Sequence, residues 1–300
     1  MSIKNVIIIG AGGNLGPSIL DAFLTSSSFN VTVLSREEST KTFPDNVKVV
    51  RANFDSFDSL KSAFQGQDAI VSLVASEALA AQIKLIDAAI AAGVKRYIPS
   101  EFGSNTADPR TLEAVPLFKG KIDIQEYLKS KESEISRTTI VTGPFFDWGL
   151  KVGFLGINAQ TKTAALIDQG TTPFSTSNLR QIGLATVKVL EQAEETKNQY
   201  VYVSSFETSQ KELLEKAEKI TGEKYKVEHL DSTELRAEGL NKIKAGDFSG
   251  FVPLIQAAVS GKAGLGDHRP CGLWNERLGL QKEDFDGSIK AGLSGKLYGQ

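Results

Sequence analysis

The segment Asn5-Val-Ile-Ile-Ile-Gly-Ala-Gly-Gly-Asn-Leu-Gly16 is an apolar run typical of a β-strand that leads directly into spaced glycines and then into a helical pattern. A dinucleotide-binding turn needs this order, because the chain must reverse tightly, admit a pyrophosphate close to its backbone and begin a helix whose free amides face the anion. A Cβ at Gly10 or Gly13 would obstruct that approach. An ordinary glycine-rich turn between a strand and a helix is the alternative. The residues expected beside a dinucleotide are Gly10, Gly13, Asn14, Leu15 and Gly16.

Size and charge limit the class of protein. The chain has 300 residues, 41% of them apolar, which suffices for one large domain or for a nucleotide-binding domain with a smaller appendage. The formal net charge is -2 and no long basic run occurs, so we expect no nucleic-acid partner. No apolar stretch reaches the length of about 18 residues that spans a bilayer, so we expect no membrane partner.

The cysteine and histidine content argues against disulfides and metals. A single cysteine, Cys271, cannot form an intrachain disulfide, and His229 and His268 cannot join it in a zinc site of standard spacing. We expect both histidines to be structural or exposed. The N-terminus lacks the charged and then apolar pattern of a signal peptide, so a cytoplasmic location is expected.

Strand-like runs alternate with helical patterns along the first half of the chain, which predicts an α/β fold. The runs are Val6–Ile9, Val31–Leu34, Val47–Val50, Ala69–Val74, Arg96–Ile98 and Thr138–Thr142. The helical patterns cover residues 16–25, 56–64, 79–92 and 117–129, and Asp55 or Ser56 can cap the second. We expect a Rossmann-type doubly wound parallel sheet with ligand sites at the carboxyl ends of its strands.

Regular alternation fades after Gly143, where glycine and aromatic residues cluster. Helical patterns continue at 179–193 and 211–221, and strand-like runs at 200–204 and 226–230. We expect residues 1–150 to form the NAD(P)-binding domain. Residues 151–300 are expected to form a smaller substrate-binding region, interleaved with the last strands of the sheet.

The end of the second strand predicts which pyridine nucleotide binds. In such folds an acid at this point accepts a hydrogen bond from the ribose 2'-hydroxyl, whereas an arginine accommodates a 2'-phosphate. Here the strand ends in Ser35 and Arg36, and Lys41 adds a second cation if the following loop folds back, so we expect NADP. Glu37 or Glu38 would take the place of the ribose acid if the strand ended later.

Two further segments are expected at the cofactor site. Asn53 and Phe54 follow the third strand and are placed to border the adenine, although a helix cap explains the next residue, Asp55, equally well. Ala75 and Ser76 follow the fourth strand, and we expect them to contact the cofactor too.

Two lysines compete for a role in proton transfer. Tyr127 and Lys131 have the spacing at which a phenol and an ammonium share one helical face, and the ammonium then lowers the pKa of the phenol. The polar segment 130–136 indicates that the helix ends there, which makes both surface residues. Lys121 lies near the start of the same helix, where it can face the nicotinamide, although a solvated lysine is the alternative.

The chain resembles the atypical short-chain dehydrogenases of the NmrA-like and isoflavone reductase-like family, and its fungal branch in particular. The matching motifs are the glycine loop at 10–16, Arg36, Pro-Ser-Glu-Phe-Gly at 99–103, Phe-x-x-Lys at 118–121 and Thr-Gly-Pro-Phe-Phe-Asp-Trp at 142–148. The resemblance spans roughly residues 4–260. It implies that Lys121 is the general acid or base and contacts the cofactor. Family reductases often carry an arginine where this chain has Gln125, so the cofactor contact at this position stays open.

Aromatic side chains are expected around the substrate. Phe102, Phe145, Phe146 and Trp148 suit a planar aromatic or enone compound, and core packing explains the last three equally well. Pro144 and Phe145 are also expected to contact the cofactor. An apolar wall of this kind would lower the pKa of Lys121 into a useful range.

Two functions follow from these motifs. The first is an NADPH-dependent reductase of a small aromatic or conjugated substrate, such as a phenylpropanoid, an isoflavonoid or a secondary metabolite, with Lys121 moving the proton. The second is a non-catalytic regulator of the NmrA type that senses NAD(P) and binds a protein partner. Retention of Lys121 favours the enzyme.

Overall fold

The computed structural model describes residues 2–75 and 81–299, so the expected cofactor contact Ser76 lies outside the described residues. The chain divides into two compact units. Unit 1 comprises Met1–Phe102, Gly120–Ile140 and Ile182–Val201. Unit 2 comprises Gly103–Lys119, Val141–Gln181 and Tyr202–Gln300. Each unit therefore draws on both halves of the sequence.

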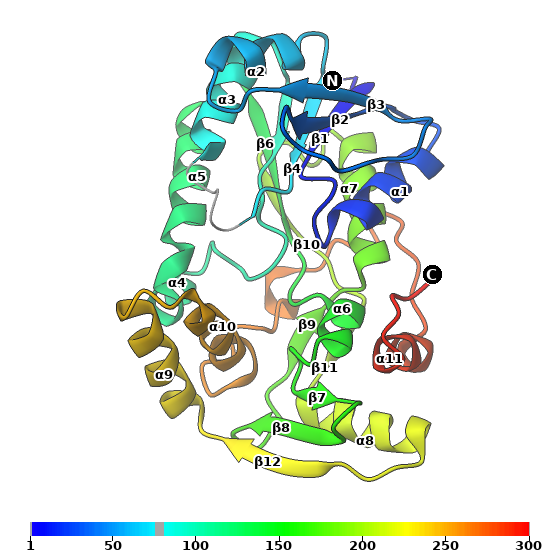
Figure 1. Cartoon of the computed structure of the whole chain (residues 1–300), viewed down its shortest axis with the longest axis vertical. Coiled ribbons are helices and arrows are strands. Elements are labelled where there is room, and N and C mark those ends of the chain that lie inside the picture. The colour runs from blue at the N-terminus through cyan, green and yellow to red at the C-terminus, as the bar shows by residue number, and fades with distance from the viewer. Residues whose placement is uncertain (1, 76–80, 300) are drawn as a thin grey trace. The chain divides into compact units, whose positions relative to one another are not determined.

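Unit 1 is built on a seven-stranded sheet with the order β10-β6-β5-β4-β1-β2-β3 (Figure 1). Its strands are β1 (Asn5–Ile9), β2 (Asn30–Arg36), β3 (Lys48–Ala52), β4 (Ala69–Ser72), β5 (Arg96–Ile98), β6 (Ser136–Val141) and β10 (Gln199–Tyr202). β1 pairs in parallel with β2, where Val6 lies opposite Val31, and with β4, where Val6 lies opposite Ala69. The strand order reverses at β1 and β4, the point at which doubly wound sheets bind ligands. The predicted Rossmann-type sheet is confirmed.

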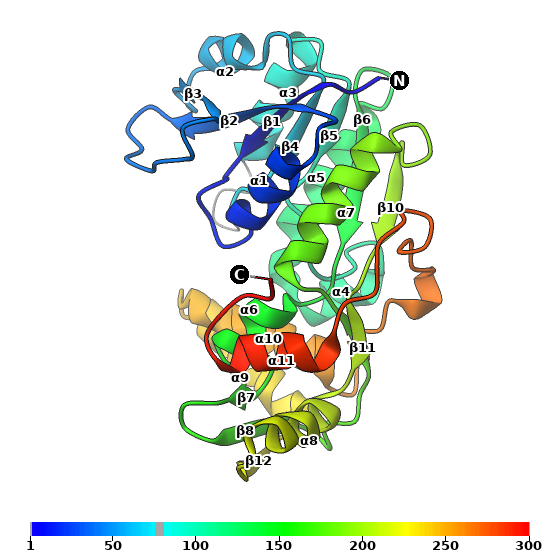
Figure 2. The ribbon, with the colours of Figure 1, turned by 90° about the vertical axis from the view of Figure 1, so that its right-hand side faces the viewer.

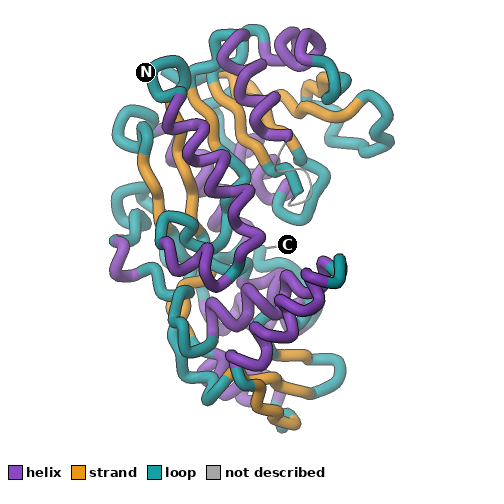
Figure 3. Tube along the Cα trace, turned by 90° about the vertical axis from the view of Figure 1, so that its left-hand side faces the viewer, coloured by secondary structure: helices purple, strands orange, loops and turns teal. Residues whose placement is uncertain are grey.

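Helices cover both faces of this sheet (Figures 1 and 2). One face carries α2 (Phe57–Phe64), α3 (Gln82–Ala91) and α5 (Lys119–Ser130), and the other carries α1 (Gly16–Thr25) and α7 (Leu179–Glu191). Figure 3 shows the first face, with helices in front of the strands. Leu60, Leu85 and Leu128 bury their side chains against the strands from α2, α3 and α5, as their helical spacing predicted. Ser56 is the residue that caps α2, because its side chain accepts from the Ser59 amide at 3.2 Å.

A buried arginine ties β5 to its neighbours. Arg96 is fully buried, and its guanidinium donates to the hydroxyls of Ser136 and Thr138 at 2.8 Å and to the Ala193 carbonyl at 2.6 Å. Burial lowers the pKa of Arg96 to about 10. The side chain therefore fixes β5 against β6 and against the end of α7 at the cost of desolvating a cation.

Unit 2 contains a three-stranded sheet, β12-β8-β7, and a two-stranded sheet, β11-β9. Their bounds are β7 (Ile157–Asn158), β8 (Thr163–Ile167), β9 (Phe174–Thr176), β11 (Phe206–Thr208) and β12 (Lys226–Leu230). The predicted strand at 226–230 pairs in parallel with β8, so it belongs to this small sheet and not to the sheet of unit 1. Gly143 forms a corner in this unit at φ +65°, where a Cβ would lie 2.0 Å from the Ser175 carbonyl oxygen.

Helices and short turns complete unit 2. They are α4 (Pro109–Ala114), α6 (Phe146–Lys151), α8 (Gln210–Thr221), α9 (Ser232–Lys244), α10 (Phe251–Ser260), α11 (Phe285–Leu293), η2 (Pro116–Phe118), η3 (Phe248–Gly250) and η4 (Arg269–Cys271). Across the described ranges of both units, no helix is long and apolar enough to cross a membrane.

Candidate functional site

A cavity of about 470 Å³ opens at the carboxyl ends of β1, β2 and β4 in unit 1. It is lined by the turn after β1, the end of β2 with its following loop, and the segment after β4. The expected cofactor contacts that line it are Gly10, Gly13, Ser35, Arg36, Lys41, Phe54 and Ala75. The residues that sequence reasoning predicted from separate segments are therefore brought to one cavity at the ligand-binding edge of the sheet.

The glycines of the β1–α1 turn have different reasons to be glycine. Gly10 has φ +83°, and a Cβ there would lie 2.5 Å from the Leu73 carbonyl oxygen. A Cβ on Gly16 would lie 2.2 Å from the Ala11 carbonyl oxygen. At Gly13 the nearest atom would be the Gly10 carbonyl oxygen at 3.4 Å. Packing within the protein thus requires Gly10 and Gly16, whereas Gly13 leaves room on the cavity side.

The helix after this turn presents its amino end to the same region. Asn14 is exposed, whereas Leu15 is buried and precedes the first residue of α1. Leu15 can therefore contribute only main-chain atoms to a ligand. Free amides at a helix amino end are the usual cradle for a pyrophosphate.

Two cationic side chains, Arg36 and Lys41, line the cavity near the end of β2. Arg36 is exposed, and its Nε lies 3.3 Å from Glu38 Oε1. The loop that carries Lys41 folds back over the turn, as the sequence required for a second cation at this site. The aliphatic chain of Lys41 lies 3.4 Å from the position that a Cβ on Gly12 would occupy. Both line the cavity, so a dianionic group could bind there with two positive charges.

Sequence reasoning missed Arg51 in this region. Arg51 lies on β3 opposite Ser35, and its Nη1 donates to the carbonyls of Arg36 at 3.2 Å and Ser39 at 2.5 Å. It therefore holds the loop that carries Arg36. The available signal was a polar residue in an apolar strand beside the predicted phosphate site.

Asn53 takes a structural role next to the cavity. Its Oδ1 accepts from the Asp55 amide at 2.8 Å, and its own amide donates to Ser59 Oγ at 3.0 Å. Asn53 is not among the residues that line the cavity, whereas Phe54 is. Of the two residues, Phe54 is the one whose side chain is available to an adenine.

Lys121 is anchored to the loop after β5. Its Nζ donates to the main-chain carbonyl of Glu101 at 2.5 Å. The residue is half-buried, and desolvation lowers its pKa, while the charge of Glu101 acts in the opposite direction. Phe102 follows Glu101 at φ +33°, a region that costs energy for a side chain of this size. The loop is thus held in a strained conformation beside Lys121.

A hydrogen-bonded chain of buried polar groups supports the same loop. Glu101 Oε1 accepts from Gln125 Nε2 at 3.1 Å, and Gln125 Oε1 accepts from Thr139 Oγ1 at 2.9 Å. All three residues are buried. The arrangement joins the loop after β5 to α5 and β6. Motif spacing gave no sign of this chain, because its members come from three separate elements.

Tyr127 and Lys131 are occupied elsewhere. The Tyr127 hydroxyl donates to the carboxylate of Asp87 on α3, which raises the pKa of Tyr127 to about 12. α5 ends at Ser130, and Lys131 pairs with Glu134 at 3.2 Å. A phenol with a raised pKa cannot serve as the activated acid of a Tyr-x-x-x-Lys pair. The predicted preference for Lys121 agrees with this geometry.

The expected aromatic residues do not share one environment. In unit 1, Phe102 is buried. In unit 2, the Phe146 ring is fully buried against Phe206 at a centroid distance of 4.8 Å, so its packing is that of a core residue, the alternative that the sequence left open beside a substrate contact. Phe145 and Trp148 are half-buried and meet edge to face at 6.3 Å. Pro144 is half-buried on the same segment.

Neither histidine belongs to the cavity of unit 1. His229 is exposed, and its Nδ1 lies 2.8 Å from the Asp168 carbonyl oxygen. His268 is buried in unit 2, where desolvation lowers its pKa to about 4. Cys271 is exposed, and its sulfur lies 3.6 Å from Asn105 Nδ2. Within the described ranges, no group of three or more His, Cys, Asp or Glu side chains is placed to hold a metal ion.

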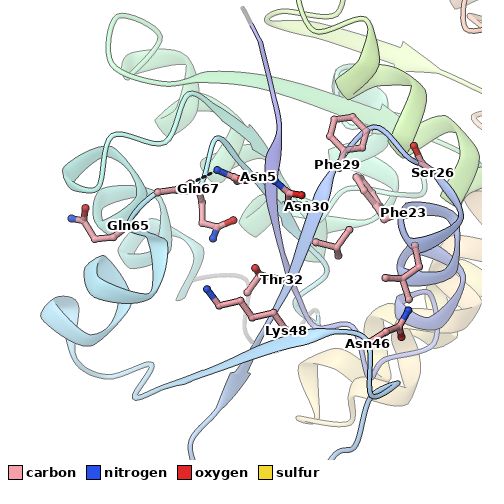
Figure 4. A pocket seen from close by; sticks show the side chains of 13 residues that line it. Asn5, Phe23, Ser26, Phe29, Asn30, Thr32, Asn46, Lys48, Gln65 and Gln67 are labelled. Carbon is pink, nitrogen blue, oxygen red and sulfur yellow. Dashed lines mark hydrogen bonds between the residues drawn. The ribbon is translucent and has the colours of Figure 1, made fainter.

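A second and larger cavity, of about 530 Å³, lies at the opposite edge of the sheet, where β1, β2 and β3 begin (Figure 4). Its wall includes Asn5, Asn30 and Gln67 and the rings of Phe23 and Phe29. Doubly wound sheets bind their ligands at the carboxyl ends of the strands. None of the expected cofactor residues lines this cavity, so its size does not make it the candidate site.

Comparisons with known proteins agree on one family. Residues 2–244 match the NmrA-like family. The oxidoreductase aprR of Aspergillus flavus is 33% identical to this chain over 303 residues. The match covers 98% of this chain and 100% of that protein. The oxidoreductase poxI of Penicillium oxalicum is 34% identical and covers 83% of this chain and 80% of its own length.

Solved structures share the fold. AtPrR2 with NADP+ and (+)pinoresinol superimposes with a TM-score of 0.73 at 24% identity and covers 89% of this chain and 91% of its own. An isoflavone reductase superimposes with a TM-score of 0.77 at 17% identity and covers 95% of this chain and 97% of its own. Likeness at these identities establishes the fold.

Proposed function

This chain belongs to the NmrA-like family and is an oxidoreductase, as its motifs predicted, and on that premise we propose that it reduces a small aromatic or conjugated molecule with NADPH. Lys121 serves as the general acid or base of this reaction. The observation that carries the proposal is the cavity at the carboxyl ends of β1, β2 and β4, with glycines on one wall and two cations on another.

The residues of the cavity fit a phosphorylated dinucleotide. Gly13 leaves the approach to the backbone open, and the amino end of α1 offers free amides for a pyrophosphate. Arg36 and Lys41 supply the charge for a 2'-phosphate, and no acid at the end of β2 takes the place of Arg36. NADPH, when bound, would supply the hydride.

Lys121 is suited to move the accompanying proton. Its ammonium is partly desolvated, which weakens its hold on the proton, and its hydrogen bond to Glu101 fixes the position of Nζ. An amine with a lowered pKa donates or accepts a proton more readily near neutral pH. Tyr127 is excluded from this role by its bond to Asp87.

The substrate class rests on the relatives and on two side chains. AtPrR2 is described with pinoresinol and a second relative in fold is an isoflavone reductase, and both names refer to aromatic compounds. Phe145 and Trp148 are the half-buried aromatic residues that we assign to substrate recognition. A planar conjugated substrate could pack against these two rings. An electron-poor carbon in such a substrate could accept the hydride.

The test is turnover. NADPH oxidation is followed by its absorbance across a panel of aromatic enones, aldehydes and imines. We expect oxidation with at least one class, loss of turnover with retained NADPH binding in Lys121→Ala, and normal turnover in Lys129→Ala, an exposed lysine on the same helix. Wild-type protein that binds NADPH and never oxidises it on the panel, or full activity in Lys121→Ala, would contradict the proposal.

A further inference from the structure

Lys121 and Gln125 both form hydrogen bonds to Glu101. Lys121 and Gln125 lie one turn apart on α5, which places both side chains on one face of the helix. Lys121 donates to the main chain of Glu101, and Gln125 donates to the carboxylate of the same residue. Thr139 on β6 in turn holds the Gln125 amide in one orientation. The main-chain carbonyl and the side chain of Glu101 therefore both accept hydrogen bonds from residues on one face of α5.

We propose that Glu101 and Gln125 are positioning residues for Lys121, which fix the place of its ammonium and set how strongly it holds its proton. This inference rests on the proposed role of Lys121. In this role neither Glu101 nor Gln125 needs to contact the substrate.

The position of the ammonium follows from the attachment of the loop. Ser100 Oγ donates to the Val74 carbonyl at 2.8 Å, and Val74 lines the cofactor cavity. The Ser100 amide donates to Gln82 Oε1 at 3.2 Å. The neighbouring Glu101 carbonyl, which receives Lys121, is therefore part of a loop that is tied to the cavity wall. A shift of this loop would move Nζ relative to that wall.

The proton affinity of Lys121 follows from the charge of Glu101. Desolvation favours the neutral amine, and the Glu101 charge opposes it, so the balance between the two sets the pKa of Lys121. From α5 the uncharged side chain of Gln125 donates to the Glu101 carboxylate, and Thr139 on β6 donates to the Gln125 amide oxygen. On α5 itself, the charged residues nearest to Lys121 in sequence are Lys119 and Asp123, each two residues away. An amide donor such as Gln125 stabilises the buried carboxylate without itself adding a positive charge beside it.

Two substitutions separate charge from shape. Glu101→Gln removes the charge and keeps the size of the side chain. Gln125→Arg keeps the carboxylate but pairs it with a cation one turn from Lys121. Both changes remove the field that opposes desolvation, so both are expected to make Lys121 more acidic, by about tenfold in its ionisation constant. Glu126→Gln, an exposed carboxylate on the same helix, is the matched control.

The measurement is the titration of Lys121 in the intact protein without substrate, followed by the 13Cε chemical shift of selectively labelled lysine and assigned with Lys121→Ala. Midpoints that move to lower pH in both variants and stay in place in Glu126→Gln support the inference. An unmoved midpoint in whichever of the two variants folds, as judged by its thermal unfolding, overturns it.

Turnover then distinguishes this inference from the proposed function. If Lys121 transfers the proton, the same shift appears in the pH profile of kcat for Glu101→Gln. If the midpoint shifts but the pH profile of kcat does not, the proposed role of Lys121 fails while its electrostatic coupling to Glu101 stands.

Discussion

Gly10 in the β1–α1 turn lies against the end of β4, so that a Cβ on Gly10 would sit 2.5 Å from the Leu73 carbonyl oxygen. Three residues later, the same atom on Gly13 would meet only the Gly10 carbonyl oxygen at 3.4 Å. The two glycines of one motif therefore serve different ends. Gly10 allows the turn to pack against the residue that follows β4, and Gly13 leaves space on the side of the cavity.

The first prediction separates these roles. Gly13→Ala is expected to fold with nearly unchanged stability and to bind NADPH at least tenfold more weakly, because its methyl group would occupy the approach to the pyrophosphate. Gly10→Ala is expected to lose about 2 kcal/mol or more of unfolding free energy, because it combines a positive φ with a backbone clash. Urea denaturation and NADPH titration measure the two effects. Equal destabilisation by both substitutions would contradict this division.

The second prediction concerns Tyr127. Tyr127→Phe removes the hydroxyl that donates to Asp87 and is expected to cost about 1 kcal/mol of unfolding free energy. Turnover of NADPH should be unaffected, since a phenol whose pKa is raised to about 12 is not the acid. Steady-state kinetics beside thermal unfolding checks both parts. A loss of kcat comparable to that of Lys121→Ala would restore the Tyr-x-x-x-Lys interpretation.

The third prediction is a pH dependence of stability from His268. Burial without a partner for either ring nitrogen in the described ranges lowers the pKa of His268 to about 4 in the folded protein. The imidazole binds a proton more readily in the unfolded chain than in the folded protein. The contribution of neutral His268 to the free energy of unfolding is therefore complete above about pH 6.5. It falls by about 3 kcal/mol as the pH falls toward 4.

Urea denaturation between pH 7 and pH 4 measures this dependence. His268→Phe should flatten it, because the phenyl ring fills a similar volume and does not titrate. His229→Asn, at an exposed histidine, is the control and should keep the wild-type slope. A wild-type slope in His268→Phe would show that other groups are responsible.

Local periodicity was sufficient to predict the sheet of unit 1. The strands from β1 to β6 were recognised as short, largely apolar runs, and the helical patterns between them bury residues such as Leu60 and Leu128. The helices of unit 2 are harder to predict. α10 (Phe251–Ser260) contains Pro253 within an almost continuous apolar run, and such a run does not distinguish a buried helix from a strand.

The candidate site was predictable where a motif is contiguous and hidden where it is assembled. Arg36 and Lys121 follow from their place after a strand and at the start of a helix. Arg51 and the bond between Glu101 and Gln125 depend on the register of β3 with β2 and on the packing of α5 against the loop after β5, which no local pattern encodes. The core packing of Phe146 stayed one of two open alternatives for the same reason, because its partner Phe206 is distant in sequence.

The most direct test of the account is the calorimetric titration of the wild-type protein and of Arg36→Ala with NADPH and with NADH. The two cations at the cavity predict that the wild-type protein binds NADPH more tightly than NADH. Arg36→Ala should lose most of that preference, about tenfold or more in affinity for NADPH, with little change for NADH. Wild-type protein that releases no heat with either coenzyme, or an Arg36→Ala protein that keeps its full preference for NADPH, would contradict the account.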